Sequence, residues 1–288
     1  RSDITGYINE SKVSINLNKI VDKKKKLWSA FIRSNKKIQL EQNIYLKNSI
    51  YCKVIEIKKE KNYVSYIIKF SLRYLDLIEF LNSHGKIPLP AYIKKKRLIN
   101  QSDIKNYQTI FADKIGAVAA PTASLHFTKR LMDKIKKKGI NIITLTLHVN
   151  GGTFLPIKSK VVEDHLMHFE KGVITQESAS KINYFKKKGG RIFAVGTTVL
   201  RLLESSKDNQ GSIKAFNGET NIYIKPGWKV NTIDALITNF HTPKSTLLLL
   251  IYAILGKKRT QEIYSFAIKH RMRFFSYGDA CLIWNKNE

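Results

Sequence analysis

The hydrophobic periodicity of the chain changes once, near residue 107, and this change limits the possible folds more than any other feature. Before it, apolar and polar residues alternate in four segments, at residues 4–8, 12–17, 27–32 and 63–68. Alternation with period two, rich in β-branched and aromatic residues, is typical of short antiparallel strands. This spacing predicts a small β-barrel or sandwich, followed by a helix over residues 71–82.

After residue 107, strand-like and helix-like segments alternate. The predicted strands cover residues 140–149, 191–195 and 235–238, and the predicted helices cover residues 128–138, 175–188, 199–206, 244–255 and 261–271. Such βα order predicts a mostly parallel sheet with helices packed on it. We therefore expect an α/β protein with a small β domain at residues 1–83 and a main α/β domain at residues 84–288.

The chain carries 51 basic and 22 acidic residues, which gives a net charge of +29. A surface this basic attracts polyanions and favours a nucleic-acid partner. However, only ten of the basic residues are arginines, the residue that specific nucleic-acid contacts usually use. Codon drift in an AT-rich genome is a competing explanation of the lysine content, and charge alone leaves both open.

The two cysteines, Cys52 and Cys281, lie far apart and form no Cys-x-x-Cys pair. Their arrangement argues against a zinc ribbon, an iron–sulfur site or a disulfide scaffold, and suits a reducing compartment. The longest apolar run, residues 247–255, is far shorter than the roughly 20 residues of a membrane helix. We expect a cytoplasmic protein without a signal peptide.

Small and polar residues gather in four loops, each beside a predicted strand or helix end, where ligands of α/β proteins collect. In the first loop, residues 116–128, small residues allow close approach of the backbone, and Thr128 is placed to cap the next helix. The alternative is a tight packed turn in which His126 is only hydrogen-bonded in place.

The second loop, residues 146–154, runs from a strand into a glycine pair. Gly151 and Gly152 could present backbone N–H groups to an anion such as a carboxylate. The alternatives are an ordinary turn and, for His148, a hydrogen-bonded core histidine.

The third loop lies within residues 189–204, where a strand ends at Gly196, Thr197 and Thr198 and a helix begins. A helix N-terminus with free N–H groups and hydroxyls is an anion site, but this one lacks the lysine and the spacing of a P-loop. For Arg201 the alternative to a role in binding is a simple pair with Glu204, at i and i+3, on the helix surface.

The fourth loop, residues 237–246, again joins a strand to an apolar helix, with Pro243 at the helix start. Asn239 and His241 could hydrogen-bond a base or a carboxylate. Residues 273–280 add aromatic side chains and one carboxylate, a mixture suited to stacking on a ring.

His165 and His168, at i and i+3 beside three acidic residues, raise the possibility of a metal site. No third ligand stands at a useful spacing, so a metal-dependent hydrolase is the most distant alternative. We expect no metal.

Taken together and in this order, the segments resemble the S-adenosylmethionine:tRNA ribosyltransferase-isomerase family of queuosine biosynthesis. The matching segments are residues 85–90 (Gly-Lys-Ile-Pro-Leu-Pro), 107–111 (Tyr-Gln-Thr-Ile-Phe), 116–128, 146–154, 165–170, 189–204, 238–256 and 274–283. The resemblance implies a mixed α/β main domain of open, barrel-like form with a small inserted antiparallel β-barrel domain.

The resemblance also implies a reaction. The ribose of S-adenosylmethionine moves to the aminomethyl group of 7-aminomethyl-7-deazaguanine at the tRNA wobble position. It is isomerised there to give epoxyqueuosine, and adenine and methionine are released. The implied partners are tRNA and S-adenosylmethionine, with no separate cofactor, metal or membrane, and the protein is expected to be a monomer.

The chemistry needs a base for the C5′–H that the sulfonium acidifies, and a donor for the departing adenine. Histidine can serve in either role, and we assign His126, His148 and His241 to base, acid or orienting contacts without ranking them. Phe127, Phe275 and Tyr277 are expected to stack on the substrate, and Asp279 to pair with its amine. The full set of expected substrate-binding residues is Thr122, Phe127, Gly151, Gly152, Thr153, Gly196, Thr197, Thr198, Arg201, Asn239, Phe275, Tyr277 and Asp279.

The chain departs from the family pattern in several places. Ser124 and Asn150 stand where the family usually has glycine, and Phe169 replaces a customary serine. A Cβ is harmful where the backbone needs a positive φ. The family's first several dozen residues, with an Asn-Asp-Thr motif, have no counterpart in the given sequence before Arg1, and only if the protein itself lacks them do we expect an open main domain and lost activity. The alternative to an enzyme is therefore a degraded family member that only binds tRNA.

Overall fold

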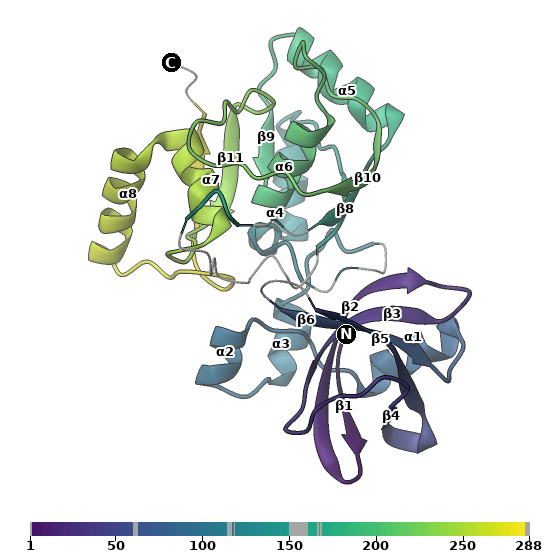
Figure 1. Ribbon diagram of the computed structural model, residues 1–288. Coiled ribbons are helices and arrows are strands. Elements are labelled where there is room, and N and C mark those ends of the chain that lie inside the picture. The colour runs from purple at the N-terminus through teal and green to yellow at the C-terminus, as the bar shows by residue number, and fades with distance from the viewer. Residues whose placement is uncertain are drawn as a thin grey trace. The chain divides into compact units, whose positions relative to one another are not determined.

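The computed structural model describes residues 2–59, 63–113, 117, 119–149, 161–165, 167 and 169–285. The chain forms two compact units (Figure 1). The first comprises Arg1–Lys105 and Ile115–Ala119, and the second comprises Asn106–Lys114 and Ala120–Glu288. The domain boundary expected between residues 83 and 84 stays a prediction, and each unit is described by itself.

The first unit contains a closed antiparallel barrel with the strand order β1-β2-β3-β6-β5-β4. Its strands are β1 (Asp3–Ile8), β2 (Ser11–Asp22), β3 (Leu27–Arg33), β4 (Asn43–Tyr45), β5 (Tyr51–Lys59) and β6 (Val64–Phe70). The barrel confirms the predicted small antiparallel β-barrel. Sequence patterning missed β4, which has three residues, and β5, whose alternation is broken by a register shift between Val54 and Glu56.

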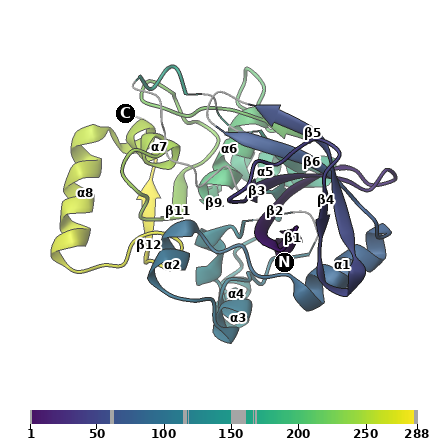
Figure 2. The same ribbon diagram turned by 60° about the horizontal axis from the view of Figure 1, so that its bottom comes forward.

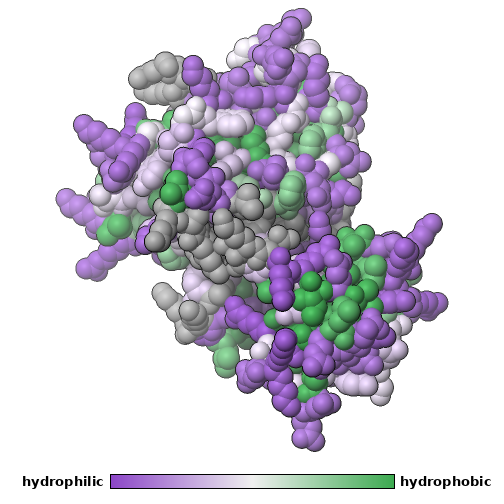
Figure 3. Space-filling view, in the orientation of Figure 1, coloured by the Kyte–Doolittle hydropathy of each residue, from purple (hydrophilic) through white to green (hydrophobic). Residues whose placement is uncertain are grey.

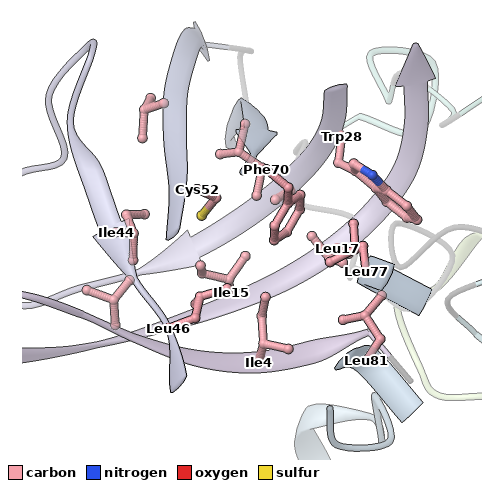
Figure 4. Close-up of a cluster of buried hydrophobic side chains, with 14 of the residues drawn as sticks. Ile4, Ile15, Leu17, Trp28, Ile44, Leu46, Cys52, Phe70, Leu77 and Leu81 are labelled. Atoms are coloured by element: carbon pink, nitrogen blue, oxygen red, sulfur yellow. The ribbon is translucent and has the colours of Figure 1, made fainter. Parts of the chain in front are cut away.

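Alternate side chains of these strands fill the barrel. Ile15, Ile44 and Phe70 are almost completely buried, and Figure 4 shows them in one apolar cluster. Helix α1 (Tyr74–His84) adds Leu77 and Leu81 to the same cluster. The helix therefore completes this apolar cluster. Helices α2 (Ala91–Lys96) and α3 (Gln101–Asn106) follow along the chain.

The second unit contains two three-stranded sheets, with the orders β10-β8-β7 and β12-β11-β9. Their strands are β7 (Thr146–His148), β8 (Glu170–Ile174), β9 (Phe193–Val195), β10 (Phe216–Thr220), β11 (Ala235–Asn239) and β12 (Ala280–Trp284). Among the described strands, only β9 and β11 pair in parallel. The prediction of a mostly parallel sheet is therefore wrong.

The sequence did not predict β8 and β10, because glycines and charged residues interrupt the apolar pattern of both strands. Gly172 interrupts the apolar pattern of β8, yet a Cβ there would lie 2.6 Å from Cδ1 of Leu202. The glycine thus allows α6 to pack closely on β8, but it also removes an apolar side chain by which the strand could have been recognised in the sequence. In β10, Gly218 lies directly opposite Gly172.

Helices cover the sheets of the second unit: η2 (Thr122–His126), α4 (Lys129–Lys137), α5 (Gln176–Lys187), α6 (Thr197–Ser206), α7 (Thr246–Leu255) and α8 (Lys257–Lys269). Helix α6 contacts β9 and β11 of one sheet and β10 of the other, and α7 lies beside α8 (Figures 1 and 2). The side chain of Thr128 accepts from the N–H of Leu131, as its predicted capping role requires. No helix in the described part of the chain combines the length and apolar character needed to span a membrane.

Candidate functional site

Three loops of the second unit meet at the side chain of Asn239, the last residue of β11. Its Oδ1 accepts from the hydroxyl of Thr122 in η2, at 3.0 Å. Its Nδ2 lies 3.1 Å from Nε2 of His126 and 3.4 Å from the carbonyl oxygen of Gly278. We call these four residues the Asn239 junction. Asn239 is 3% exposed, whereas His126 is exposed, so the junction joins the protein interior to a ring that solvent can reach.

The loop that opens α6 is tied to the same place. The N–H of Gly196 donates to the carbonyl of Ile237 in β11 at 2.9 Å, and a Cβ on Gly196 would lie 3.9 Å from that of Ala123 in η2. Gly196 has a φ of 98°, which favours glycine. Thr197 and Thr198, the first residues of α6, follow directly, so the predicted helix N-terminus lies beside η2.

Residues 273–279 form a tight loop against the junction. The N–H of Phe275 donates to the carbonyl of Phe240, just after β11, and the N–H of Gly278 donates to the carbonyl of Phe275, each at 2.9 Å. Phe275 has a φ of 72°, unusual for a bulky residue. The loop thus holds backbone strain where the predicted site residues gather.

Asp279 closes this loop through Arg273. Its carboxylate accepts from the backbone N–H of Arg273 at 2.8 Å and from the guanidinium Nη2 at 2.9 Å. The backbone N–H, then the guanidinium, and last the nearby His126 hold the pKa of Asp279 below its usual range. The pairing of Asp279 with a substrate amine stays a prediction, and an amine would compete with Arg273.

His241 lies two residues beyond Asn239 in a different setting. Its Nε2 is 2.9 Å from the hydroxyl of Thr238, and its backbone N–H donates to the hydroxyl of Tyr264 at 2.9 Å. Burial lowers the pKa of His241 to about 4. The ring is therefore neutral near pH 7, where one nitrogen can donate and the other can accept a hydrogen bond, but it does not carry the additional proton of an imidazolium.

Aromatic rings flank the junction. The ring of Tyr277 meets that of Tyr107 edge to face at 5.5 Å, and the ring of Phe127 meets that of Phe111 at 6.0 Å. Phe127, Phe275 and Tyr277 are half-buried, so each keeps part of its ring accessible. Their stacking on a substrate stays a prediction.

Arg201 and Glu204 differ from expectation. Both are buried, and they do not pair with each other: Arg201 pairs with Glu170 of β8 and donates to the carbonyl of Ile222, while Glu204 accepts from Lys207. The alternative of a surface pair is wrong because α6 lies between two sheets, which turns this face into the core. The assignment of Arg201 to substrate binding stays a prediction.

The second predicted loop is only partly within the described residues. His148 is half-buried in β7, opposite Lys171 of β8, on the sheet that does not contain Asn239. Gly151, Gly152 and Thr153 lie outside the described residues, as do Asn150 and His168.

Two further expectations can be placed. Ser124 lies in η2 with no positive φ, so its Cβ is compatible with the backbone there. His165 is buried, and burial lowers its pKa. Within the described ranges, no three His, Cys, Asp or Glu side chains gather closely enough to hold a metal ion.

Sequence reasoning missed several residues that shape this region: Tyr107, Thr238, Tyr264, Arg273 and Gly278. Tyr264 lies within a helix and carried no local signal. Gly278 carried one, because a glycine among aromatic residues after a helix often marks a tight turn.

Comparison with known proteins places the chain in context. A family model described as "Queuosine biosynthesis protein" matches residues 3–283. A protein of Parvibaculum lavamentivorans is 45% identical over 257 residues, which cover 89% of this chain and 73% of the relative. One of Erythrobacter litoralis is 42% identical over 283 residues, which cover 98% of this chain and 80% of the relative. Both relatives are named S-adenosylmethionine:tRNA ribosyltransferase-isomerase.

A crystal structure of an S-adenosylmethionine tRNA ribosyltransferase from Thermotoga maritima is also similar. It is 26% identical to this chain, with a TM-score of 0.46, and the alignment covers 98% of this chain and 78% of the other.

Proposed function

The chain belongs to the queuosine biosynthesis protein family, and we propose that it acts as an S-adenosylmethionine:tRNA ribosyltransferase-isomerase. It transfers the ribose of S-adenosylmethionine to 7-aminomethyl-7-deazaguanine at the tRNA wobble position and isomerises it. The products are epoxyqueuosine, adenine and methionine. The family match over residues 3–283 carries this proposal.

The Asn239 junction supports it chemically. A sulfonium nucleoside needs hydrogen-bond partners for its base and ribose, and Thr122, Asn239 and His126 bring hydroxyl, amide and imidazole groups together in one network. The half-buried rings of Phe127 and Tyr277 supply flat apolar surface nearby. We assign the nucleoside to this region, with His148 and His241 as the other histidines to test.

The test is product release. The full chain, S-adenosylmethionine and tRNA carrying the 7-deazaguanine precursor are expected to yield adenine and methionine, and no adenine forms when the tRNA is left out. Each histidine-to-alanine variant should lower turnover more than tRNA binding. tRNA binding without adenine release would favour the degraded binder, and turnover that a chelator abolishes would contradict our proposal that no metal or separate cofactor takes part.

The cellular setting follows from the substrate. A tRNA-modifying enzyme works where tRNA matures, so we propose the cytoplasm. We also propose a monomer. Sedimentation that gives the mass of two chains would contradict the latter.

A salt-dependence experiment tests how the tRNA is held. Helix α4 begins three residues after His126 and has no buried residue. Its lysines and arginine form no ion pair with a carboxylate among the described residues, so their positive charges are available to contact phosphates. Hydrophilic side chains are also common on the face of this unit that Figure 3 shows. Changing Lys134, Lys136 and Lys137 to alanine is expected to raise KM for tRNA. The slope of log KM against log salt concentration should fall by about 0.7–0.9 for each phosphate that is no longer neutralised.

The control uses lysines that carboxylates already neutralise. Lys53, Lys58 and Lys181 form ion pairs with Glu41, Glu56 and Glu177. Their alanine variant is expected to change the salt slope less, and both variants should keep the wild-type kcat. Equal slopes for both variants would show that α4 is only a solvated face.

A further inference from the structure

The carboxamide of Asn239 has only one orientation that satisfies its neighbours. The carbonyl oxygen of Gly278 can only accept a hydrogen bond, so the Asn239 atom 3.4 Å from it is the amide nitrogen. The remaining atom, the oxygen, then faces the hydroxyl of Thr122 at 3.0 Å, and that hydroxyl can donate. The two contacts fix the amide independently of the histidine.

This orientation determines the state of His126. The same amide nitrogen lies 3.1 Å from Nε2 of the imidazole, and an amide nitrogen can only donate. Nε2 must therefore accept with its lone pair. In a neutral imidazole one nitrogen accepts and the other carries the proton, so the proton of His126 is on Nδ1.

From this arrangement we propose that Asn239 is a positioning residue that holds His126 as the Nδ1–H tautomer, so that His126 donates a hydrogen bond to the leaving adenine. The basic lone pair is already occupied, so His126 is not the group that removes the C5′ proton. The adenine leaves with the electron pair of the glycosidic bond, and a donor aimed at a ring nitrogen stabilises that charge. The inference rests on the proposed function and ranks the histidines that the sequence left unranked.

Burial and charge at the junction agree with this role. Asn239 is buried and held on two other sides, so it is rigid, whereas His126 is exposed and a ligand can reach its ring. The charged group that interacts with His126 is Asp279, and Arg273 already pairs with that carboxylate. The Asp279 carboxylate is therefore held by Arg273 within its own loop.

The first test reads the tautomer directly. In the full chain labelled with ¹⁵N-histidine, two-bond ¹H–¹⁵N spectra distinguish Nδ1–H from Nε2–H, and loss of one signal set in His126→Gln assigns the ring. We expect Nδ1–H in the wild type. In Asn239→Asp the carboxylate can only accept, so Nε2 should become protonated. An Nε2–H signal in the wild type overturns the proposal without any activity measurement.

The second test separates a donor from a base. An asparagine side chain places its amide near the Nδ1 position of histidine, and a glutamine places its amide near Nε2. If Nδ1–H is the donor, His126→Gln should lower kcat about a hundredfold, and His126→Asn should retain about tenfold more activity than that. KM for both substrates should change little. Equal losses in the two variants would indicate a base and overturn the proposal, whereas a wild type that releases no adenine would instead contradict the proposed function.

Discussion

Replacement of Gly278 by alanine is expected to lower kcat by about a hundredfold or more, because a displacement of about 1 Å in a catalytic site has that effect. A Cβ at this position would lie 2.4 Å from the carbonyl carbon of Phe274 and 2.5 Å from the carbonyl oxygen of Arg273. Both are backbone atoms, so the loop must open. Opening moves the Gly278 carbonyl away from Asn239 and releases one side of the junction.

The matched control is Gly139→Ala at the end of α4. Gly139 has a φ of 71°, and no atom lies within 4 Å of an added Cβ. Alanine there strains the backbone but clashes with no other atom. It should cost about 1–2 kcal/mol of stability and leave kcat unchanged. Steady-state kinetics with a melting curve for each variant check the comparison. If Gly278→Ala had the wild-type kcat, residues 273–279 would not be part of the catalytic site.

Replacement of Glu204 by alanine is expected to lower the free energy of unfolding by about 3–5 kcal/mol, because it leaves buried donors without their acceptor. The side chain of Glu204 has no solvent exposure. Its carboxylate accepts from Thr232 at 2.7 Å, Trp228 at 2.9 Å, Lys207 at 2.7 Å and the backbone N–H of Asn231 at 3.1 Å. The single carboxylate thus fastens the chain after β10 to the end of α6.

The same residue gives a pH-dependent prediction. Burial alone would raise the pKa of Glu204, but Lys207, Trp228 and Thr232 outweigh it and hold the pKa below the usual 4.5. A lowered pKa in the folded state stabilises the protein above 4.5, and this stabilisation is lost as the pH falls through the folded-state value. The deficit of Glu204→Gln relative to the wild type should therefore shrink in acid.

Urea unfolding at several pH values measures both effects. Glu262→Ala, an exposed glutamate on α8, is the control and should change stability by less than about 0.5 kcal/mol. A deficit of Glu204→Gln that stays constant down to the acid limit of folding would show that its charge contributes nothing to stability.

The local sequence pattern was sufficient to predict the structure where the interactions that determine it join residues close in sequence. The alternation in β2 predicts which side chains enter the barrel, and Val13, Ile15 and Leu17 are all buried. The start of α5 is fixed by Thr175, whose side chain accepts from an N–H three residues on. The positions of the loops that contain Thr122 and Asn239 at strand and helix ends also follow from this local order.

Tertiary structure was needed wherever a partner lies far along the chain. Arg201 pairs with Glu170 rather than with nearby Glu204, because α6 packs between two sheets, whereas the sequence predicted a single, mostly parallel sheet. The junction joins Thr122 to Asn239 across 117 positions.

The sequence by itself therefore indicated a small antiparallel β domain, most of the helices, the family and the candidate residues, since short-range periodicity, capping and motif order are recorded in neighbouring positions. The tertiary structure alone decided the mixed sheets, the buried ion pair and the direction of each hydrogen bond at Asn239. Those features depend on which distant groups are brought within about 3 Å, where donor and acceptor geometry acts.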